Sequence, residues 1–225
     1  GVQPFGGEGL SGTGPKAGGP LYLLRLLSQR PADALARTFA DADRTTPPEE
    51  AVRERLLAPL ATLQQWAQLQ GNAALANTCQ QFAQQTQSGT ARTLPGPTGE
   101  RNVYTLAPRG RVLCLARSVD DLLVQTAAVL ASGGTALWPT AQANLRTPLP
   151  KLVQAQIQLQ DNTLNDGTLE LDAVLHHGDA PSLQAVCTAL ARRAGPIVGV
   201  TALQPGATDI PLERLLIERA LSVNT

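Results

Sequence analysis

The fold class follows from residues 112–138, which read VLCLARSVDDLLVQTAAVLASGGTALW. The first five of these residues form an apolar run of the kind found in a buried strand. Ser118 can cap a helix that carries two aspartates in its first turn, because a hydroxyl accepts from free amides and acids favour the positive helix end. Two glycines at 133–134 end this helix, and 135–138 is apolar again. The stretch therefore predicts a strand, a helix and a second strand.

The same alternation continues downstream. The apolar periodicity predicts a helix over residues 148–159, a strand over 171–176, a helix over 183–194 and a strand over 197–201. Asp179 or Ser182 is expected to cap the second of these helices, which ends in Arg192 and Arg193 before a glycine. Alternating strands and helices imply a parallel sheet with helices on its faces. We therefore predict an α/β protein with a Rossmann-like parallel sheet.

The part of the chain before this unit has helical character. Helices are predicted over residues 29–43, 47–70 and 72–87. Thr45 or Thr46 is expected to cap the second helix, which begins with prolines and acids. The third is rich in Ala and Gln, and its polarity suggests a connector rather than a core element. Residues 88–100 contain several prolines and glycines and are expected to form a loop.

Composition limits the classes of function. The chain has 225 residues with 18 basic and 18 acidic side chains, so it presents no electrostatic footprint for nucleic acid. Its longest apolar runs are far shorter than the roughly 20 residues of a membrane span. Cys79, Cys114 and Cys187 lie far apart without C-x-x-C spacing, so no metal site is predicted and reduced, partly buried thiols are expected. These features fit a cytoplasmic protein.

Residues 7–12, GEGLSG, formally satisfy the pattern G-x-G-x-x-G. A dinucleotide site needs a strand before these glycines and a helix that begins at the last of them. Pro4 precedes the pattern, and Pro15 and more glycines follow it, so neither element is expected. We therefore interpret the glycines as turn formers rather than as a phosphate-binding loop.

Both ends of the chain resemble one enzyme family. The first 27 residues, GVQPFGGEGLSGTGPKAGGPLYLLRLL, resemble the end of the aldehyde dehydrogenase domain of proline utilization A, the bifunctional bacterial enzyme that oxidises proline to glutamate. The last 16, IPLERLLIERALSVNT, resemble the start of that family's C-terminal motif. The resemblance implies a piece of a larger enzyme that is truncated at both ends. The match is close at the two ends and looser between them.

The resemblance implies roles for the Pro4-Phe5-Gly6-Gly7 motif. In the family, a phenylalanine at the position of Phe5 packs against the aliphatic stem of glutamate semialdehyde, and glycines at Gly6 and Gly7 shape a turn beside the substrate. The catalytic cysteine, its partner glutamate and the cofactor-binding domain lie outside these 225 residues. No catalytic residue is therefore assigned within the chain, which is expected to be inactive alone.

Residues 108–140 resemble a degenerate copy of an aldehyde dehydrogenase nucleotide-binding half. Active relatives place an oxyanion asparagine where this chain has Arg117-Ser118-Val119, and a ribose-binding lysine where it has Trp138. Long members of the family carry a non-catalytic domain of this kind after the working one. The resemblance therefore implies that no nicotinamide cofactor binds here.

Two charged groups have competing interpretations. Glu213, Arg214, Glu218 and Arg219 have the spacing of one helix face, which is usually solvated. The resemblance instead implies that they dock onto the catalytic domain. His176-His177 ends a predicted strand near Asp179, but without a well-spaced third ligand a surface loop is expected rather than a metal site.

The resemblance divides the chain into four parts. They are the catalytic-domain tail at residues 1–27, a helical connector at 28–92, a non-catalytic Rossmann-like domain at 93–209 and a truncated docking motif at 210–225. The whole enzyme would use FAD for proline and NAD for the aldehyde, both bound elsewhere, and any membrane association would also come from other parts. The chain would cover the cavity between the two active sites and support contacts within a homo-oligomer. Two alternatives to this covering role remain open. One is an autonomous nucleotide-binding enzyme built on residues 88–206, and the other is a pure oligomerisation module.

Overall fold

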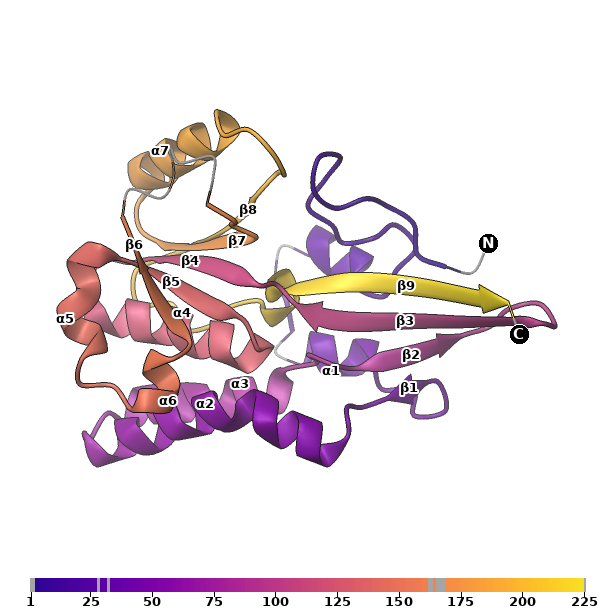
Figure 1. Ribbon diagram of the computed structural model, residues 1–225, viewed down its shortest axis with the longest axis horizontal. Helices are drawn as coiled ribbons and strands as arrows, with labels where there is room; N and C mark the ends of the chain where they lie inside the picture. The colour runs from indigo at the N-terminus through magenta and orange to yellow at the C-terminus, as the bar shows by residue number, and fades with distance from the viewer. Residues whose placement is uncertain (1–2, 28, 32, 162–163, 165–168, 225) are drawn as a thin grey trace.

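The computed structural model describes residues 3–27, 29–31, 33–161, 164 and 169–224. Predictions that include Gly1, Val2, Ser28, Ala32 or Thr225 lie in part outside these residues. The structure contains a five-stranded parallel sheet and a four-stranded antiparallel sheet that extends from it as an arm (Figure 1). The two sheets together contain all nine strands of the described residues.

The parallel sheet confirms the predicted α/β class. Its strands are β4 (Arg111–Leu115), β5 (Thr135–Pro139), β6 (Ile157–Gln160), β7 (Ala173–His177) and β8 (Gly199–Leu203), in the spatial order β6-β5-β4-β7-β8. Every neighbouring pair is parallel. The chain thus starts in the middle, moves to one edge, and then crosses to the other side. This order matches the first five strands of the Rossmann order 3-2-1-4-5-6. The topological switch point, where successive strands are added on opposite sides, lies between β4 and β7.

The strand–helix–strand unit forms as the sequence predicts. The Ser118 hydroxyl accepts a hydrogen bond from the Asp121 amide at 3.0 Å and caps α4 (Val119–Ser132). At the other end, Gly133 has a φ of 80°, which glycine adopts without strain, and it closes the helix. Almost the whole surface of α4 is buried, because it lies between the sheet and two further helices.

Those two helices belong to the core. α2 (Glu50–Leu69) and α3 (Ala73–Gln85) pack on each other and on α4 (Figure 1). Leu63 from α2 and Cys79 and Phe82 from α3 are buried in the cluster that continues to the sheet. The expectation that the Ala- and Gln-rich helix is a polar connector is therefore wrong: its apolar residues recur on one buried face while the glutamines lie on the other.

The antiparallel arm differs from the sequence predictions. Its strands, in spatial order, are β1 (Thr45–Thr46), β2 (Ala91–Leu94), β3 (Glu100–Pro108) and β9 (Leu216–Asn224). β2 lies within the segment predicted as a loop, and Thr45 and Thr46 pair with it instead of capping a helix. β3 and β9 pair over their full length, from Glu100–Asn224 to Pro108–Leu216. The β3–β9 pairing joins residues more than a hundred positions apart, which no local pattern reports, so the sequence patterns do not predict it.

The remaining elements are short. They are α1 (Ala34–Thr38), α5 (Ala143–Arg146), α6 (Lys151–Gln154), α7 (Ala180–Ala191) and the 3-10 helices Tyr22–Leu26, Thr140–Gln142 and Leu212–Leu215. The helix predicted over residues 29–43 is reduced to α1, and the one over 148–159 gives way to α6 and strand β6. Asp179 caps α7, as one of the two predicted alternatives. Among the described residues no helix combines the length and apolarity of a membrane span.

Candidate functional site: the glycine hairpin and the antiparallel arm

The glycine-rich segment forms a hairpin. The Phe5 amide donates to the Ala17 carbonyl at 2.9 Å, and the Ala17 amide returns a bond to Phe5 at 2.7 Å. Nearer the tip, Glu8 and Thr13 form a second antiparallel bridge. No helix begins at the glycines, since the chain turns back on itself instead. This hairpin has the form of a closed loop rather than a phosphate cradle.

The residues predicted to line the substrate lie at the base of this hairpin. Phe5 is 83% exposed, and so it has no packing role within the described part of the chain. Gly6 has a φ of 138°, a backbone conformation that side chains rarely allow. A β-carbon on Gly7 would lie 2.3 Å from the Ser11 hydroxyl oxygen, so Ser11 would have to change rotamer to admit a side chain there. The turn therefore presents an aromatic ring next to a backbone position suited to glycine.

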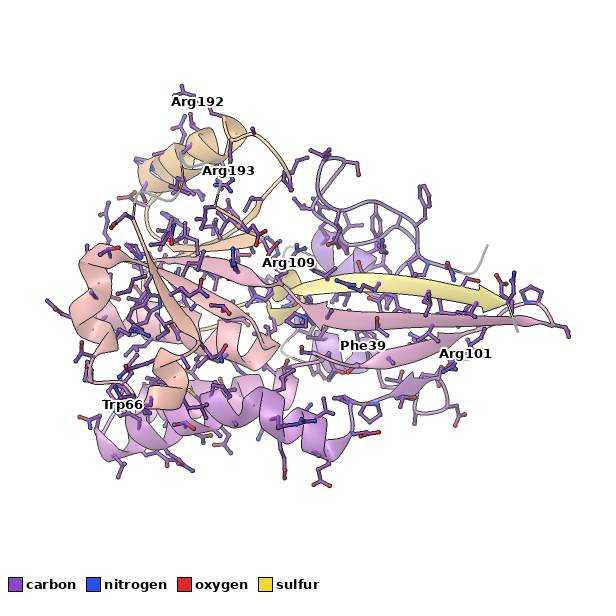
Figure 2. All side chains as sticks on the ribbon, viewed as in Figure 1. Phe39, Trp66, Arg101, Arg109, Arg192 and Arg193 are labelled. Carbon is purple, nitrogen blue, oxygen red and sulfur yellow. The ribbon has the colours of Figure 1, made fainter. Side chains whose placement is uncertain are left out.

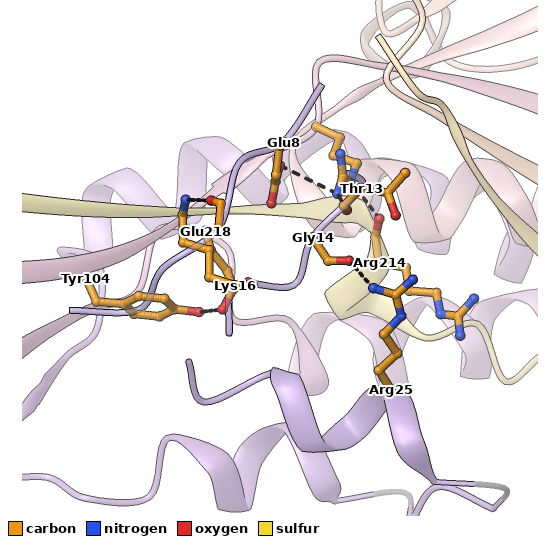
Figure 3. A network of polar contacts seen from close by, with 10 residues as sticks. Glu8, Thr13, Gly14, Lys16, Arg25, Tyr104, Arg214 and Glu218 are labelled. Carbon is orange, nitrogen blue, oxygen red and sulfur yellow. Dashed lines mark hydrogen bonds and ion pairs between the residues drawn. The ribbon is translucent and has the colours of Figure 1, made fainter. Parts of the chain in front are cut away.

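Lys16 connects the turn to the arm (Figure 3). Its ammonium group donates to the Gly6 carbonyl at 2.6 Å. Its backbone amide donates to the carboxylate of Glu218 on β9. The other carboxylate oxygen of Glu218 accepts from the Tyr104 hydroxyl of β3 at 2.6 Å. The buried Glu218 carboxylate thus joins two strands of the arm to the hairpin.

Burial sets the acid–base properties of this pair. Loss of solvent raises the pKa of Glu218 above its ordinary value of 4.5, although hydrogen bonds from Tyr104 and Lys16 act in the opposite direction. Burial and the adjacent Glu218 carboxylate also raise the pKa of Tyr104. The phenol therefore stays protonated and acts as the donor.

Arginines hold the rest of the hairpin. Arg109 lies where the arm meets the parallel sheet (Figure 2), and its guanidinium donates to the Thr13 carbonyl at 2.9 Å and to the Arg214 carbonyl at 2.9 Å. It also lies 3.8 Å from the Glu8 carboxylate. Arg25 donates to the Gly14 carbonyl at 2.6 Å (Figure 3). The hairpin is therefore held at its tip as well as its base.

Glu213, Arg214, Glu218 and Arg219 do not share a helix face, so the helix interpretation of these four residues is wrong, while their docking role stays a prediction. Glu213 and Arg214 lie on a 3-10 turn, where Glu213 forms an ion pair with Arg30. Glu218 and Arg219 lie on β9, where successive side chains point to opposite faces. Glu218 is accordingly buried and Arg219 exposed. Burial raises the pKa of Glu213.

Sequence reasoning missed Lys16, Tyr104 and Arg109. Each acts on a partner about a hundred or more positions away, since the Tyr104–Glu218 separation is 114 residues and the Lys16–Glu218 separation is 202. The available signal was the run Val103-Tyr104-Thr105, whose β-branched and aromatic residues favour a strand. In the structure Tyr104 is buried, and the two residues beside it are partly buried.

A cavity of about 390 Å³ lies under the hairpin. It is lined by residues of both charges, among them Glu8, Arg25, Arg109, Asp172, Arg214 and Glu218. Ala173 and Gly199 also line it, and they begin β7 and β8. The cavity therefore opens at the amino ends of the parallel strands, the end opposite to the usual ligand site of such sheets.

The carboxyl end of the sheet is filled where the strand order reverses. The Gln125 amide donates to the Leu115 carbonyl at 2.9 Å and contacts His177 Nδ1 at 2.8 Å. His177 Nε2 lies 2.8 Å from the Ala207 carbonyl, which assigns the proton to Nε2. The Asp121 carboxylate accepts from the Gly206 amide at 2.9 Å. These bonds tie the 204–208 turn over the start of α4.

These residues do not fit a dinucleotide. Asp120 and Asp121 occupy the first turn of α4, where a pyrophosphate would need free amides and no negative charge. Trp138 is fully buried, and its indole donates to the Thr126 hydroxyl at 3.0 Å. Arg117 is exposed and pairs with Asp179 at 3.3 Å.

The two histidines are buried at the end of β7, so the predicted surface loop is wrong. Desolvation lowers the pKa of His176.

Cys79 and Cys114 are buried while Cys187 is exposed, and all three are free thiols. Within the described ranges no three His, Cys, Asp or Glu side chains gather as a metal site would require.

Together, the strand order, the hydrogen-bonded side chains at the carboxyl end of the sheet and the long antiparallel arm define an α/β protein with a Rossmann-like sheet. No family model matches the sequence. The chain does align over its full length with proteins named bifunctional protein PutA, at 52% identity over 227 residues in Klebsiella aerogenes and 53% over 228 residues in Salmonella typhimurium. The Rhizobium meliloti protein is 36% identical over 211 residues, 92% of this chain. The predicted resemblance to proline utilization A is therefore confirmed.

The chain spans 17% of the length of the first two relatives and 16% of the third. A solved proline utilization A structure with proline bound in remote sites superposes with a TM-score of 0.53 at 19% identity, over 79% of this chain and 22% of its own. The Bdellovibrio bacteriovorus enzyme gives 0.52 at 13% identity, over 68% and 20%. These superpositions agree with the α/β fold.

Proposed function

We propose that this chain is part of a bifunctional enzyme that oxidises proline to glutamate, with FAD for the first step and NAD for the second, both held outside these residues. Similarity to bifunctional PutA proteins over the whole of this chain supports this assignment. The chain contributes one wall of the glutamate semialdehyde site through Phe5, Gly6 and Gly7. The observation that carries this role is the exposed Phe5 ring next to Gly6, whose φ of 138° favours glycine.

The segment around this turn needs a partner surface. Leu10, Leu23 and Leu26 are each at least 70% exposed, in a segment that also exposes Phe5. Four large apolar side chains left exposed within residues 5–26 support a surface that a partner covers. The partner is the catalytic aldehyde dehydrogenase domain of the same polypeptide, and the exposed Leu221 and Val223 on β9 extend the surface along the arm.

The parallel-sheet domain has a structural role in this proposal. The filled carboxyl end and the aspartates at the start of α4 support a domain that binds no nicotinamide cofactor. They count against the alternative of an autonomous nucleotide-binding enzyme. The domain and the motif with Glu213, Arg214, Glu218 and Arg219 dock on the catalytic domain, cover the cavity between the active sites and support contacts in a homo-oligomer.

Phe5→Ala in the full-length protein tests the substrate role. Removing the ring takes away apolar contact with the aldehyde, so kcat/KM for glutamate semialdehyde should fall about 10- to 100-fold, on the scale of 1–3 kcal/mol for a buried apolar group. Proline oxidation with an artificial electron acceptor should stay unchanged. Leu69→Ala, which truncates an exposed apolar side chain at the end of α2, serves as a control. Equal aldehyde kinetics in Phe5→Ala and wild type would remove Phe5 from the site.

Titration of the full-length protein with NAD tests the role of the sheet domain. We expect one NAD-binding site per protomer, in the part of the protein outside these residues. A second site that is lost when the 88–206 segment is mutated would favour the nucleotide-binding alternative.

A further inference from the structure

We propose that Glu218 is a positioning residue for aldehyde binding and acts through Lys16 on the Phe5–Gly7 turn. This inference rests on the proposed substrate role of the turn. It assigns to one carboxylate of the C-terminal motif a task more specific than docking.

The first step is the position of the carboxylate. Glu218 lies opposite Leu106 in the β3–β9 register, with Tyr104 two residues along β3. Its side chain is 3% exposed. It accepts from the Tyr104 hydroxyl on one oxygen and from the Lys16 amide on the other. Tyr104 thus fixes the carboxylate to the arm, and the second oxygen remains directed at the hairpin.

The second step runs from Lys16 to the turn. The Lys16 ammonium group holds the Gly6 carbonyl at 2.6 Å, and the next residue, Ala17, exchanges two backbone bonds with Phe5. Lys16 and Ala17 therefore contact the backbone of both residues at the start of the turn. A shift of Lys16 relative to the arm would move Phe5 and Gly6 with it.

The third step is the close packing at this junction. A β-carbon on Gly19 would lie 2.8 Å from a Glu218 carboxylate oxygen and 2.9 Å from the Lys16 carbonyl. The return strand of the hairpin therefore passes directly against the carboxylate. This contact leaves little room for the hairpin to slide along the arm while Glu218 is in place.

The cost of burying a carboxylate supports a specific role. An apolar side chain of similar volume would avoid the desolvation penalty if packing were the only requirement. A carboxylate instead offers two acceptors that can bind donors from two different segments at once. At Glu218 both acceptors are used, and they join segments 114 and 202 residues away.

Steady-state kinetics of the full-length enzyme test the inference. Glu218→Ala removes both acceptors, and because a misplaced Phe5 loses part of an apolar contact worth about 1–3 kcal/mol, KM for glutamate semialdehyde should rise by up to about 10-fold. The kcat of aldehyde oxidation at saturation should change less than KM, and proline oxidation should not change. Glu218→Gln should restore KM, because the amide oxygen can accept from Lys16 while the amide NH2 donates to the Tyr104 oxygen.

Glu100→Ala is the matched control. Glu100 lies on the same strand pair, four residues before Tyr104 on β3, and accepts from the Ser222 hydroxyl at 2.5 Å. Its removal should leave KM for the aldehyde unchanged. If Glu100→Ala raises KM as much as Glu218→Ala, general loosening of the arm explains the effect and the positioning role is wrong.

Lys16→Met provides a second variant in case Glu218→Ala fails to fold. It keeps the backbone amide on Glu218 but removes the contact to the Gly6 carbonyl, so KM should again rise with kcat little changed. An unchanged KM in Lys16→Met or in folded Glu218→Ala would overturn the inference. Phe5→Ala separates the two proposals: if it raises KM while these variants do not, the turn binds substrate without help from Glu218. If Phe5→Ala has no effect, the proposed function of the turn itself fails.

Discussion

The two ends of the parallel sheet differ in how their polar groups are used. At the carboxyl end, Gln125, His177 and Asp121 bond to backbone groups of the same domain and close the crevice between β4 and β7. At the amino end, a cavity of about 390 Å³ lies beneath a hairpin with an exposed aromatic ring. The same sheet therefore has a closed end where its topology favours a ligand site and an open end where it does not.

This difference shows that strand order alone does not locate function. A Rossmann-like sheet provides a crevice at its switch point, but the side chains there decide whether a ligand can enter. Here the open region is made by segments from outside the sheet: the hairpin of the first residues and the arm formed with the last ones. Function is therefore proposed at the junction of the two chain ends rather than at the sheet.

The largest expected effect tests whether the closed end is a packed core. Trp138→Ala removes a fully buried indole and the donor to Thr126, so the free energy of unfolding should fall by about 3–5 kcal/mol. Urea denaturation of the 225-residue chain measures it. Trp66→Ala on α2, where the ring is only partly buried, should cost less. A Trp138→Ala protein as stable as wild type would mean that this end has room for a ligand after all.

A smaller loss is expected when the bonds that close the crevice are cut. Gln125→Ala leaves the Leu115 carbonyl and His177 Nδ1 without their shared donor, and unsatisfied buried groups cost about 1–3 kcal/mol each. The urea midpoint should drop accordingly, while Gln68→Ala on the exposed face of α2 should leave it near wild type. NAD affinity should not appear in Gln125→Ala, because Asp120 and Asp121 remain at the helix start. Binding of NAD by this variant would show that the network alone closes a working site.

The accuracy of the sequence predictions also differs between the two regions. The unit at 112–138 could be predicted because its signals are local: an apolar run, a serine cap and a glycine stop within a single short stretch. The helix interpretation of residues 213–219 failed because i,i+4 charge spacing also occurs on a strand, and β9 exists only through its pairing with β3. The resemblance named Glu218 as a docking residue, and that role stays a prediction. Its partners Tyr104 and Lys16 could not be found, because nothing in a single sequence reports a contact across 114 or 202 residues.

The smallest expected effect is a pH dependence that distinguishes the hairpin junction from the rest of the arm. Burial is the largest influence on Glu218, with Glu8 adding to it and Tyr104 and Lys16 opposing it, and the pKa in the folded state lies above 4.5. The folded protein therefore holds this proton more tightly than the unfolded chain does. Its contribution to stability is greatest below pH 4.5 and falls as the pH rises through the folded pKa. Glu218→Gln cannot titrate, so its stability relative to wild type should rise over that interval and then level off.

Glu100 gives the matched comparison, with the opposite sign. The Ser222 hydroxyl bond lowers the pKa of this exposed carboxyl below 4.5, so its contribution is present above pH 4.5 and is lost as the pH falls through the folded pKa. Glu100→Gln should therefore lose stability relative to wild type as the pH rises through that lower range. Urea midpoints of the three proteins, measured at intervals from about pH 3 to about pH 8, give both curves. If the Glu218→Gln difference instead followed that of Glu100→Gln, the donors from Tyr104 and Lys16 would outweigh burial, and the junction would be held more tightly at neutral pH than burial alone suggests.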